Sequence, residues 1–158
     1  MSLKGIYQVS GTSVTSNGIA RPYAAERAVD PTTEAVRWVV VSADYELHVE
    51  ACAYLASLRR VDRSVNTERV YAGRVALYLS YCVTHGIDWK KPGLPTLARL
   101  LYWLVEEPTP SKGQKPGVEP RFRSKVTANQ IMTTLCGFLQ FCGQQGWVSS
   151  ETVGQLSE

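Results

Sequence analysis

The sequence has little of several features that would assign it quickly to a functional class. Its 158 residues include two histidines and four cysteines, and no two cysteines have the CxxC spacing of a zinc site. No apolar run is long enough to cross a bilayer, and the N-terminus does not resemble a secretory signal. We therefore expect a cytoplasmic protein with no membrane partner, no cofactor and no metal, whose thiols are buried and reduced (Cys52, Cys82, Cys136 and Cys142).

Charge of one sign is also scarce, because the formal net charge is only +3. Residues 1–44 sum to zero, so the whole excess lies in residues 45–158. It gathers in two clusters, one at 59–74 and one at 112–125. Such clusters suit either a phosphate footprint or a solvated surface, and charge alone does not separate the two.

The chain is apolar enough for a core, with 44% hydrophobic residues, and its periodicity changes along its length. Residues 1–35 are rich in small residues and predict a loose arm, whereas 36–41 are β-branched and predict a strand, with 6–9 as its candidate partner. From Tyr45 the apolar spacing predicts helices at about 45–60, 66–85, 96–106 and 126–145. A long, mobile, basic loop is expected at 107–122, and residues 147–158 suggest a linker.

The second and fourth expected helices share a pattern at an offset of 60 residues. Both begin with Arg-Ser-x-x-Thr, at 63–67 and 123–127, and both stop before a glycine, Gly86 or Gly146. The serines can cap the first backbone N–H groups, and a helix start also attracts anions. Two phosphate-sized sites and ordinary capping beside solvated arginines both fit this pattern.

One face of each of these helices carries side chains that are mostly small or hydrogen-bonding. Asn66, Arg69 and Gly73 lie on that face of the second helix, and Val126, Asn129 and Thr133, with Gln130 beside them, lie on that of the fourth. Glycine inside a helix costs about 1 kcal/mol relative to alanine, which a close approach to another surface would explain. The face suits a DNA groove, where Asn and Gln can recognise adenine and Arg guanine, or another protein.

Segments 64–71, 78–82 and 86–88 resemble the second helix of the core-binding domain of tyrosine recombinases and phage integrases, and 124–146 resembles that domain's last helix. Together with the run 36–40, the chain looks most like actinobacterial integrases. The resemblance implies an all-α, SAM-like four-helix domain that forms half of a clamp on duplex DNA. It would span 45–150, after an N-terminal arm (1–44) that holds loose chain or a short strand pair, and before the start of an interdomain linker (151–158).

The resemblance also implies which residues contact DNA, with Arg and Lys holding phosphates and Asn66, Arg69, Asn129 and Gln130 contacting bases. Carried over by position, the DNA-binding residues are Arg63, Ser64, Asn66, Thr67, Arg69, Arg74, Arg123, Ser124, Lys125, Thr127, Asn129, Gln130 and Thr133.

The catalytic residues of that family are not expected here. The family cuts DNA with a tyrosine, two arginines, a lysine and a histidine-type group in a second domain, and neither His48 nor His85 begins an HxxR segment. The last tyrosine, Tyr102, falls in an apolar helix. We therefore expect a fragment that is not itself an enzyme and is monomeric alone, whose parent is a tyrosine recombinase. Its partners would be double-stranded DNA and, in the full-length assembly, further recombinase protomers.

Two alternatives remain open at this point. A helical protein-interaction module would dock a partner through the apolar Leu97–Leu104 stripe or the 1–44 arm. A stand-alone DNA-binding regulator would share the DNA contacts, and only the reading frame after Glu158 would distinguish it from a recombinase.

Overall fold

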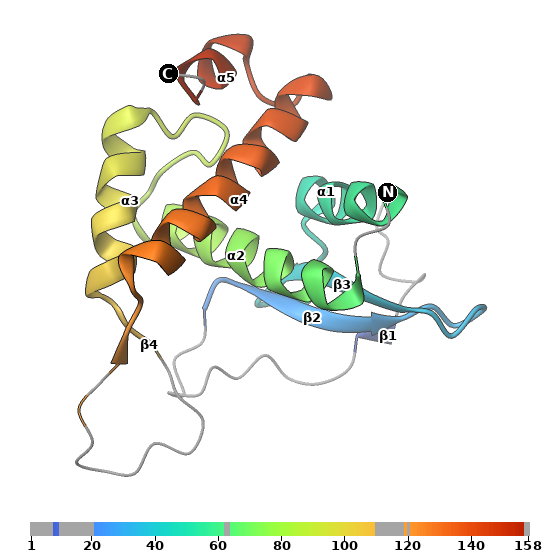
Figure 1. The fold of residues 1–158 in the computed structure, drawn as a ribbon. Coiled ribbons are helices and arrows are strands. Elements are labelled where there is room, and N and C mark those ends of the chain that lie inside the picture. Colours follow the sequence, from blue (N-terminus) through green and yellow to red (C-terminus); the bar gives the residue numbers. More distant parts are fainter. Residues whose placement is uncertain (1–7, 10–20, 62–63, 110–118, 120, 157–158) are drawn as a thin grey trace.

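The computed structural model describes residues 8–9, 21–61, 64–109, 119 and 121–156. In Figure 1, α2 runs across the middle of the molecule with β2 below it, and α4 crosses it. The elements in chain order are β1 (Gln8–Val9), β2 (Tyr23–Val29), β3 (Val36–Ser42), α1 (Val49–Arg60), α2 (Val65–Thr84), α3 (Leu94–Glu106), β4 (Pro108–Thr109), β5 (Arg121–Phe122), α4 (Lys125–Gln144) and α5 (Ser150–Leu156).

The expectation of an all-α fold is wrong, because the helices are combined with antiparallel sheets. One sheet has the strand order β1-β2-β3, and β4 pairs with β5 in a second, two-stranded sheet. The strand expected at 36–41 is β3, but its partner is β2 along its whole length, from Tyr23↔Ser42 to Val29↔Val36. Of the segment expected to pair with it, Gln8 and Val9 lie on the opposite edge of β2. Residues 6 and 7 lie outside the described part of the chain.

The first sheet belongs to the core because α2 holds it from one side. The Ser80 hydroxyl accepts from the Tyr23 N–H at 2.9 Å and donates to the Tyr23 carbonyl at 3.0 Å. Val40 of β3 lies in the main core with the helices, whereas Val39 and Val41 pack with Cys52 of α1 in a second cluster. Strand β3 is therefore buried on both faces, which explains why it carries consecutive valines instead of an alternating pattern.

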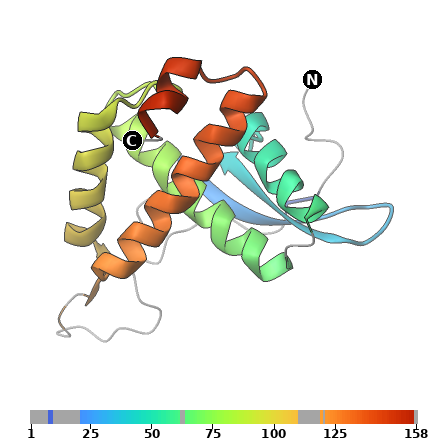
Figure 2. The same ribbon diagram turned by 45° about the horizontal axis from the view of Figure 1, so that its top comes forward.

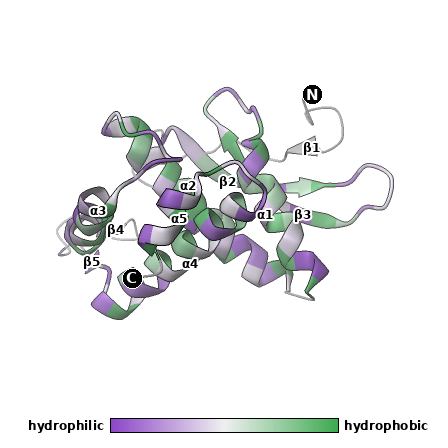
Figure 3. Cartoon of the chain, turned by 90° about the horizontal axis from the view of Figure 1, so that it is seen from above, coloured by the Kyte–Doolittle hydropathy of each residue, from purple (hydrophilic) through white to green (hydrophobic). Residues whose placement is uncertain are grey.

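The hairpin of β2 and β3 reaches beyond the helices that cover it. Figure 2 shows its turn extending past α1 and α2, and Figure 3 shows hydrophilic colour at this turn. Asp30 organises the turn, since its carboxylate accepts from the Thr32 N–H at 2.8 Å and the Thr33 N–H at 3.3 Å. Backbone hydrogen bonds to the carboxylate lower the pKa of Asp30.

The four expected helices are present as α1 to α4, and their bounds lie within a few residues of those predicted. The apolar stripe of α3 is buried, with Leu97 8% exposed and Leu100 and Leu104 fully buried. These leucines therefore pack into the core of the protein itself and are not exposed for docking a partner. Residues 110–118 and 120 of the expected basic loop lie outside the described residues.

Helices α2 and α4 meet at matching positions and carry the centre of the core. Arg74 Nη1 donates to Thr134 Oγ1 at 2.9 Å, and each residue is the tenth of its helix (65 to 74 and 125 to 134). Tyr78 and Phe138, also 60 residues apart, are both fully buried. The repeated sequence pattern therefore corresponds to a crossing of two equal helices at their midpoints.

A fifth helix replaces the linker expected after residue 147. The Ser149 hydroxyl accepts from the Thr152 N–H at 3.3 Å at the start of α5. The helix packs on the end of α4, where a Cβ added at Gly143 would collide with the side chain of Val153. Across the helices of the described chain, none combines the length and the apolar character that crossing a membrane requires.

Candidate nucleic-acid interface

The starts of α2 and α4 have the same geometry. Ser64 and Ser124 are the N-cap residues, with φ and ψ of −68° and 158° in one case and −70° and 161° in the other. Each serine Oγ accepts from the backbone N–H of the threonine three residues later, Thr67 or Thr127, at 3.1 Å. Both serines are exposed, so the free N–H groups of each first turn face solvent. The capping expected from the sequence is thus confirmed at both helices.

The ends of the two helices repeat as closely as their starts. Gly86 and Gly146 follow the helices with φ of +66° and +80°, a left-handed conformation that favours glycine. The next residues, Ile87 and Trp147, donate their N–H to carbonyls five residues back, at 2.8 and 2.9 Å. Two helices of 20 residues each are therefore fixed at both ends in the same way.

The polar faces predicted on α2 and α4 lie on the surface. On α2, Asn66 and Arg69 are exposed, and Asn66 Oδ1 accepts from Nε and Nη2 of Arg69 at 3.2 and 3.1 Å. On α4, Lys125, Asn129, Gln130 and Thr133 are exposed, as is the apolar Val126 (67%), and Thr133 Oγ1 donates to the Asn129 carbonyl at 3.0 Å. The polar side chains keep donors and acceptors that a groove or a phosphate can use.

Two of the predicted DNA-contacting arginines are partly buried and bonded to other elements of the protein. Arg74 bonds to Thr134, and its guanidinium lies 5.6 Å from the centre of the Tyr71 ring. Arg123, whose side chain is 12% exposed, donates to Glu107 Oε2 at 3.1 Å and to the Leu104 carbonyl at 3.2 Å. Arg74 therefore joins α2 to α4, and Arg123 joins the end of α3 to the start of α4. Arg63, the counterpart of Arg123, lies outside the described residues.

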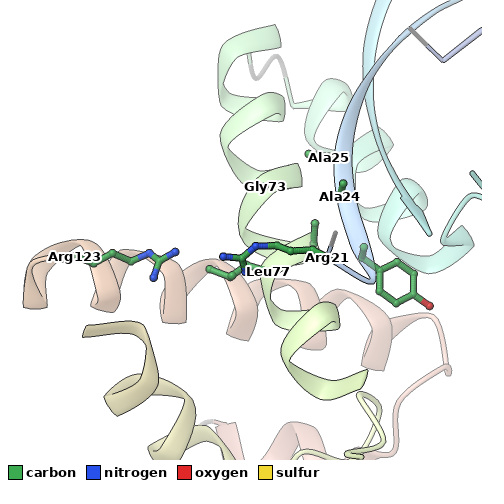
Figure 4. A pocket seen from close by; sticks show the side chains of 8 residues that line it. Arg21, Ala24, Ala25, Gly73, Leu77 and Arg123 are labelled. Atoms are coloured by element: carbon green, nitrogen blue, oxygen red, sulfur yellow. The ribbon is translucent and has the colours of Figure 1, made fainter. Parts of the chain in front are cut away.

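An open hollow of about 260 Å³ lies beside the exposed face of α2. Its walls come from β2 (Tyr23, Ala24 and Ala25), from α2 (Gly73, Ala76 and Leu77) and from two arginines, Arg21 and Arg123. Figure 4 shows the guanidinium groups of Arg21 and Arg123 approaching one another from opposite sides of the hollow. Since Arg123 precedes α4, the hollow connects the exposed face of α2 with the start of α4.

The groups with shifted pKa values are mostly buried, away from the polar faces. Burial raises the pKa of Cys82 to about 11 and that of Cys142 to about 12. Burial also raises the pKa of Tyr78, whose hydroxyl donates to the Trp89 carbonyl at 2.7 Å. All four cysteines are free, and no group of three or more His, Cys, Asp or Glu residues in the described chain is placed to hold a metal.

Sequence reasoning missed Arg21, because its place in the hollow depends on contacts across the whole chain. Its Nη2 donates to Glu107 Oε1 at 2.8 Å, and the two residues are 86 positions apart. Arg21 also precedes a strand that the sequence did not predict. The sequence analysis did identify Gly73, because a glycine in the middle of a helix lowers the stability of that helix.

Comparison of this chain with protein-family models, with curated proteins and with solved structures finds no match in any of the three. A functional assignment therefore depends on the residues and geometry described above.

Proposed function

We propose that this chain binds duplex DNA through the exposed faces of α2 and α4, as the N-terminal, DNA-binding part of a tyrosine-type site-specific recombinase. The observation that carries the proposal is the crossing of two 20-residue helices at matching midpoints, each with an exposed polar face and an exposed start. The family part of the proposal comes from the residues of these same two helices. The β1-β2-β3 sheet is an addition to the helical domain that the resemblance implies.

The spacing of the two helix starts suits one turn of a duplex. Each start lies about 15 Å from the crossing, because ten residues of helix rise by about 1.5 Å each. The two starts are therefore at most about 30 Å apart, which is within the roughly 34 Å of one B-DNA turn. Both starts can thus reach phosphates of one helical turn while the faces between them lie near the base edges.

The exposed residues divide into two kinds of contact. Lys125 and the free N–H groups beside Ser64 and Ser124 suit phosphates, which supply affinity and fix the register without specifying sequence. Asn129 and Gln130 have the amides that can pair with adenine in the major groove. Arg69 can pair with guanine once its Nε and Nη2 groups exchange the exposed Asn66 Oδ1 for the base.

In this proposal the chain binds DNA and does not cut it. The cutting chemistry would belong to a second domain of the recombinase, and other protomers of that recombinase would be its protein partners. We place the protein in the cytoplasm, where a site-specific recombinase of the actinobacterial type would meet its DNA.

The direct test is the binding of the whole chain to short labelled duplexes, followed by fluorescence anisotropy at increasing salt. The logarithm of the affinity should fall linearly with the logarithm of the salt concentration, by about 0.9 for each phosphate neutralised. The double variant Arg69→Ala with Lys125→Ala should bind every duplex at least about tenfold more weakly, which corresponds to about 1.4 kcal/mol. Unchanged affinity in that variant would contradict the proposed surface.

A matched control removes the same charge elsewhere. Lys91 and Arg99 are exposed and lie in the loop before α3 and on α3. The double variant Lys91→Ala with Arg99→Ala should bind DNA nearly as wild type does, apart from a small loss from the lower net charge. Equal losses in both double variants would indicate attraction by net charge instead of a defined surface.

The base contacts need a separate measurement, made with a pool of random duplexes. Asn129→Ala should alter which sequences are selected, while its affinity for an average duplex should change little. An identical sequence preference in wild type and variant would remove Asn129 from the base-contacting residues.

A further inference from the structure

We propose that the hollow between β2, α2 and the start of α4 is a subsite for one phosphodiester of the DNA backbone, which rests on the proposed function and extends it to the sheet. Its volume of about 260 Å³ is below the roughly 300–1,000 Å³ of pockets for drug-sized ligands. That volume suits a small group such as a phosphodiester with part of its sugar. The walls contribute charge, a close backbone approach and a stretch of backbone edge without a partner among the described residues, each from a different element.

The charge comes from Arg21 and Arg123, which share a single carboxylate. Arg21 bonds to Glu107 Oε1 at 2.8 Å and Arg123 to Glu107 Oε2 at 3.1 Å, so the three groups sum to one positive charge. Only Nη2 of Arg21 and Nη1 of Arg123 make these bonds. The remaining guanidinium N–H groups have no partner among the described residues and can bind a second anion. Glu107 therefore holds the two arginines ready, and it also competes with a phosphate for them.

Gly73 supplies the close approach. It lies near the middle of α2 and lines the hollow, and an added Cβ there would meet nothing within 4 Å. No contact in the described protein thus requires a glycine, and its counterpart on α4 is Thr133. Glycine lowers helix stability but lets a ligand approach the backbone. A phosphate seated against Gly73 would account for this choice.

Strand β2 supplies the backbone edge. Ala25 pairs with Val40, whose carbonyl accepts from the His48 N–H at 2.9 Å on the far side of β3. In an antiparallel ladder the paired residue then also directs its N–H and carbonyl outward, as Tyr23 does towards Ser80. The Ala25 N–H therefore points away from β3 along the edge that lines the hollow, where it can donate to a phosphate oxygen.

The test uses three variants of the whole chain and a labelled duplex at several salt concentrations. Arg21→Ala should bind about tenfold more weakly and lose about 0.9 from the salt slope, as expected when one phosphate contact is lost. Glu107→Gln should bind several-fold more tightly, because the neutral amide no longer competes for the arginines. Gly73→Ala should unfold at a higher temperature yet bind at least about threefold more weakly, since its methyl group occupies the hollow.

The size of the effects separates a ligand site from a purely structural cluster. A structural cluster predicts that Arg21→Ala and Glu107→Gln lower the unfolding temperature and change binding only as much as the altered net charge does, which Arg99→Ala measures for the loss of one positive charge. Gly154→Ala in α5 is the matched control for glycine, because an added Cβ there also meets nothing within 4 Å. It should not alter DNA affinity.

The outcomes also separate this inference from the proposed function. If Arg21→Ala and Gly73→Ala keep wild-type affinity and salt slope while Arg69→Ala with Lys125→Ala weakens binding, the subsite is wrong and the helix faces stand. If the wild-type chain binds no duplex at low salt, both proposals are overturned.

Discussion

Helices α2 and α4 are alike in sequence pattern and unlike in surroundings. They share length, a serine cap, a terminal glycine and a crossing point at Arg74 and Thr134. They differ at position four of each helix, where α2 has Glu68 and α4 has Ala128, both almost fully buried. The Glu68 carboxylate joins α2 to β3 and α1, while Ala128 only fills space. The shared pattern thus determines the helix ends and the buried face of both helices. A single different residue within it, Glu68 instead of alanine, determines which neighbouring elements a helix is bonded to.

The largest effect is expected at Glu68. Its Oε1 accepts from the Trp38 N–H at 3.0 Å and from Arg59 Nε at 3.0 Å, and its side chain is 1% exposed. Glu68→Ala leaves both donors without this acceptor and should cost about 3 kcal/mol of unfolding free energy in urea titrations. Glu68→Gln keeps an acceptor for Trp38 and should cost about 1 kcal/mol. A loss in Glu68→Ala no greater than that in Glu68→Gln would show that the carboxylate does not link the sheet to the helices.

The next effect concerns the C-terminal ends of α2 and α4. Of these two ends, that of α4 has a further helix, α5, packed on it in the described structure. Gly143→Ala brings a methyl group into the side chain of Val153 and should cost about 2 kcal/mol by overpacking or by detaching α5. The equivalent residue of α2 is Val83, which is 55% exposed, so Val83→Ala should change stability by less than about 0.5 kcal/mol. Thermal unfolding of the two variants measures the difference. Equal midpoints would mean that α5 does not pack on α4.

The helix starts should respond equally. Ser64→Ala and Ser124→Ala each remove the hydroxyl that accepts from a threonine N–H at 3.1 Å. Each should cost about 1 kcal/mol in urea unfolding, because the loss of an N-cap has that typical magnitude. If the two losses of unfolding free energy differ by more than about 0.5 kcal/mol, the helix starts are not equivalent. Equal losses would support their equivalence.

The smallest effect is a pH dependence at α1, the helix that a histidine caps. His48 caps it by accepting from the Ala51 N–H through Nδ1, and burial lowers the pKa of His48 below its usual 6.5. The unfolded chain therefore takes up this proton first, so the contribution is complete above pH 6.5 and is lost as pH falls through the folded-state pKa. His48→Asn keeps a capping acceptor and should flatten stability in that range. A wild-type and variant difference that does not change with pH would refute this role.

The sequence was sufficient for the helices because their signals are local. Apolar spacing placed α1 to α4, and serine caps and terminal glycines marked the ends of α2 and α4. The same Ser-x-x-Thr signal is present at Ser149–Thr152, at the start of α5, which was not predicted. Strand β2 gave no such signal, because its sequence YAAERAV contains residues of low strand propensity. Its stability depends on pairing with β3 and on the Ser80 bonds to Tyr23, which are contacts between distant residues.

The same distinction between local sequence signals and contacts of distant residues applies to the candidate site. The exposed faces follow from helical periodicity, so Asn66, Arg69, Asn129 and Gln130 lie on the surface as the pattern requires. The internal bonds of Arg74 and Arg123 depend on partners from other elements, as does the placement of Arg21. Periodicity specifies the face on which a side chain lies and leaves its tertiary partner open.

The central claim is that the faces of α2 and α4 form one DNA-binding surface. The most direct test compares wild type with the Arg69→Ala, Lys125→Ala double variant for duplex binding across a salt series, with Lys91→Ala, Arg99→Ala as the control of equal charge. The account predicts steep salt dependence for wild type, a loss of at least about tenfold for the first variant and a nearly unchanged affinity for the control. Binding that is absent in wild type at low salt, or equally weakened in both variants, would contradict it.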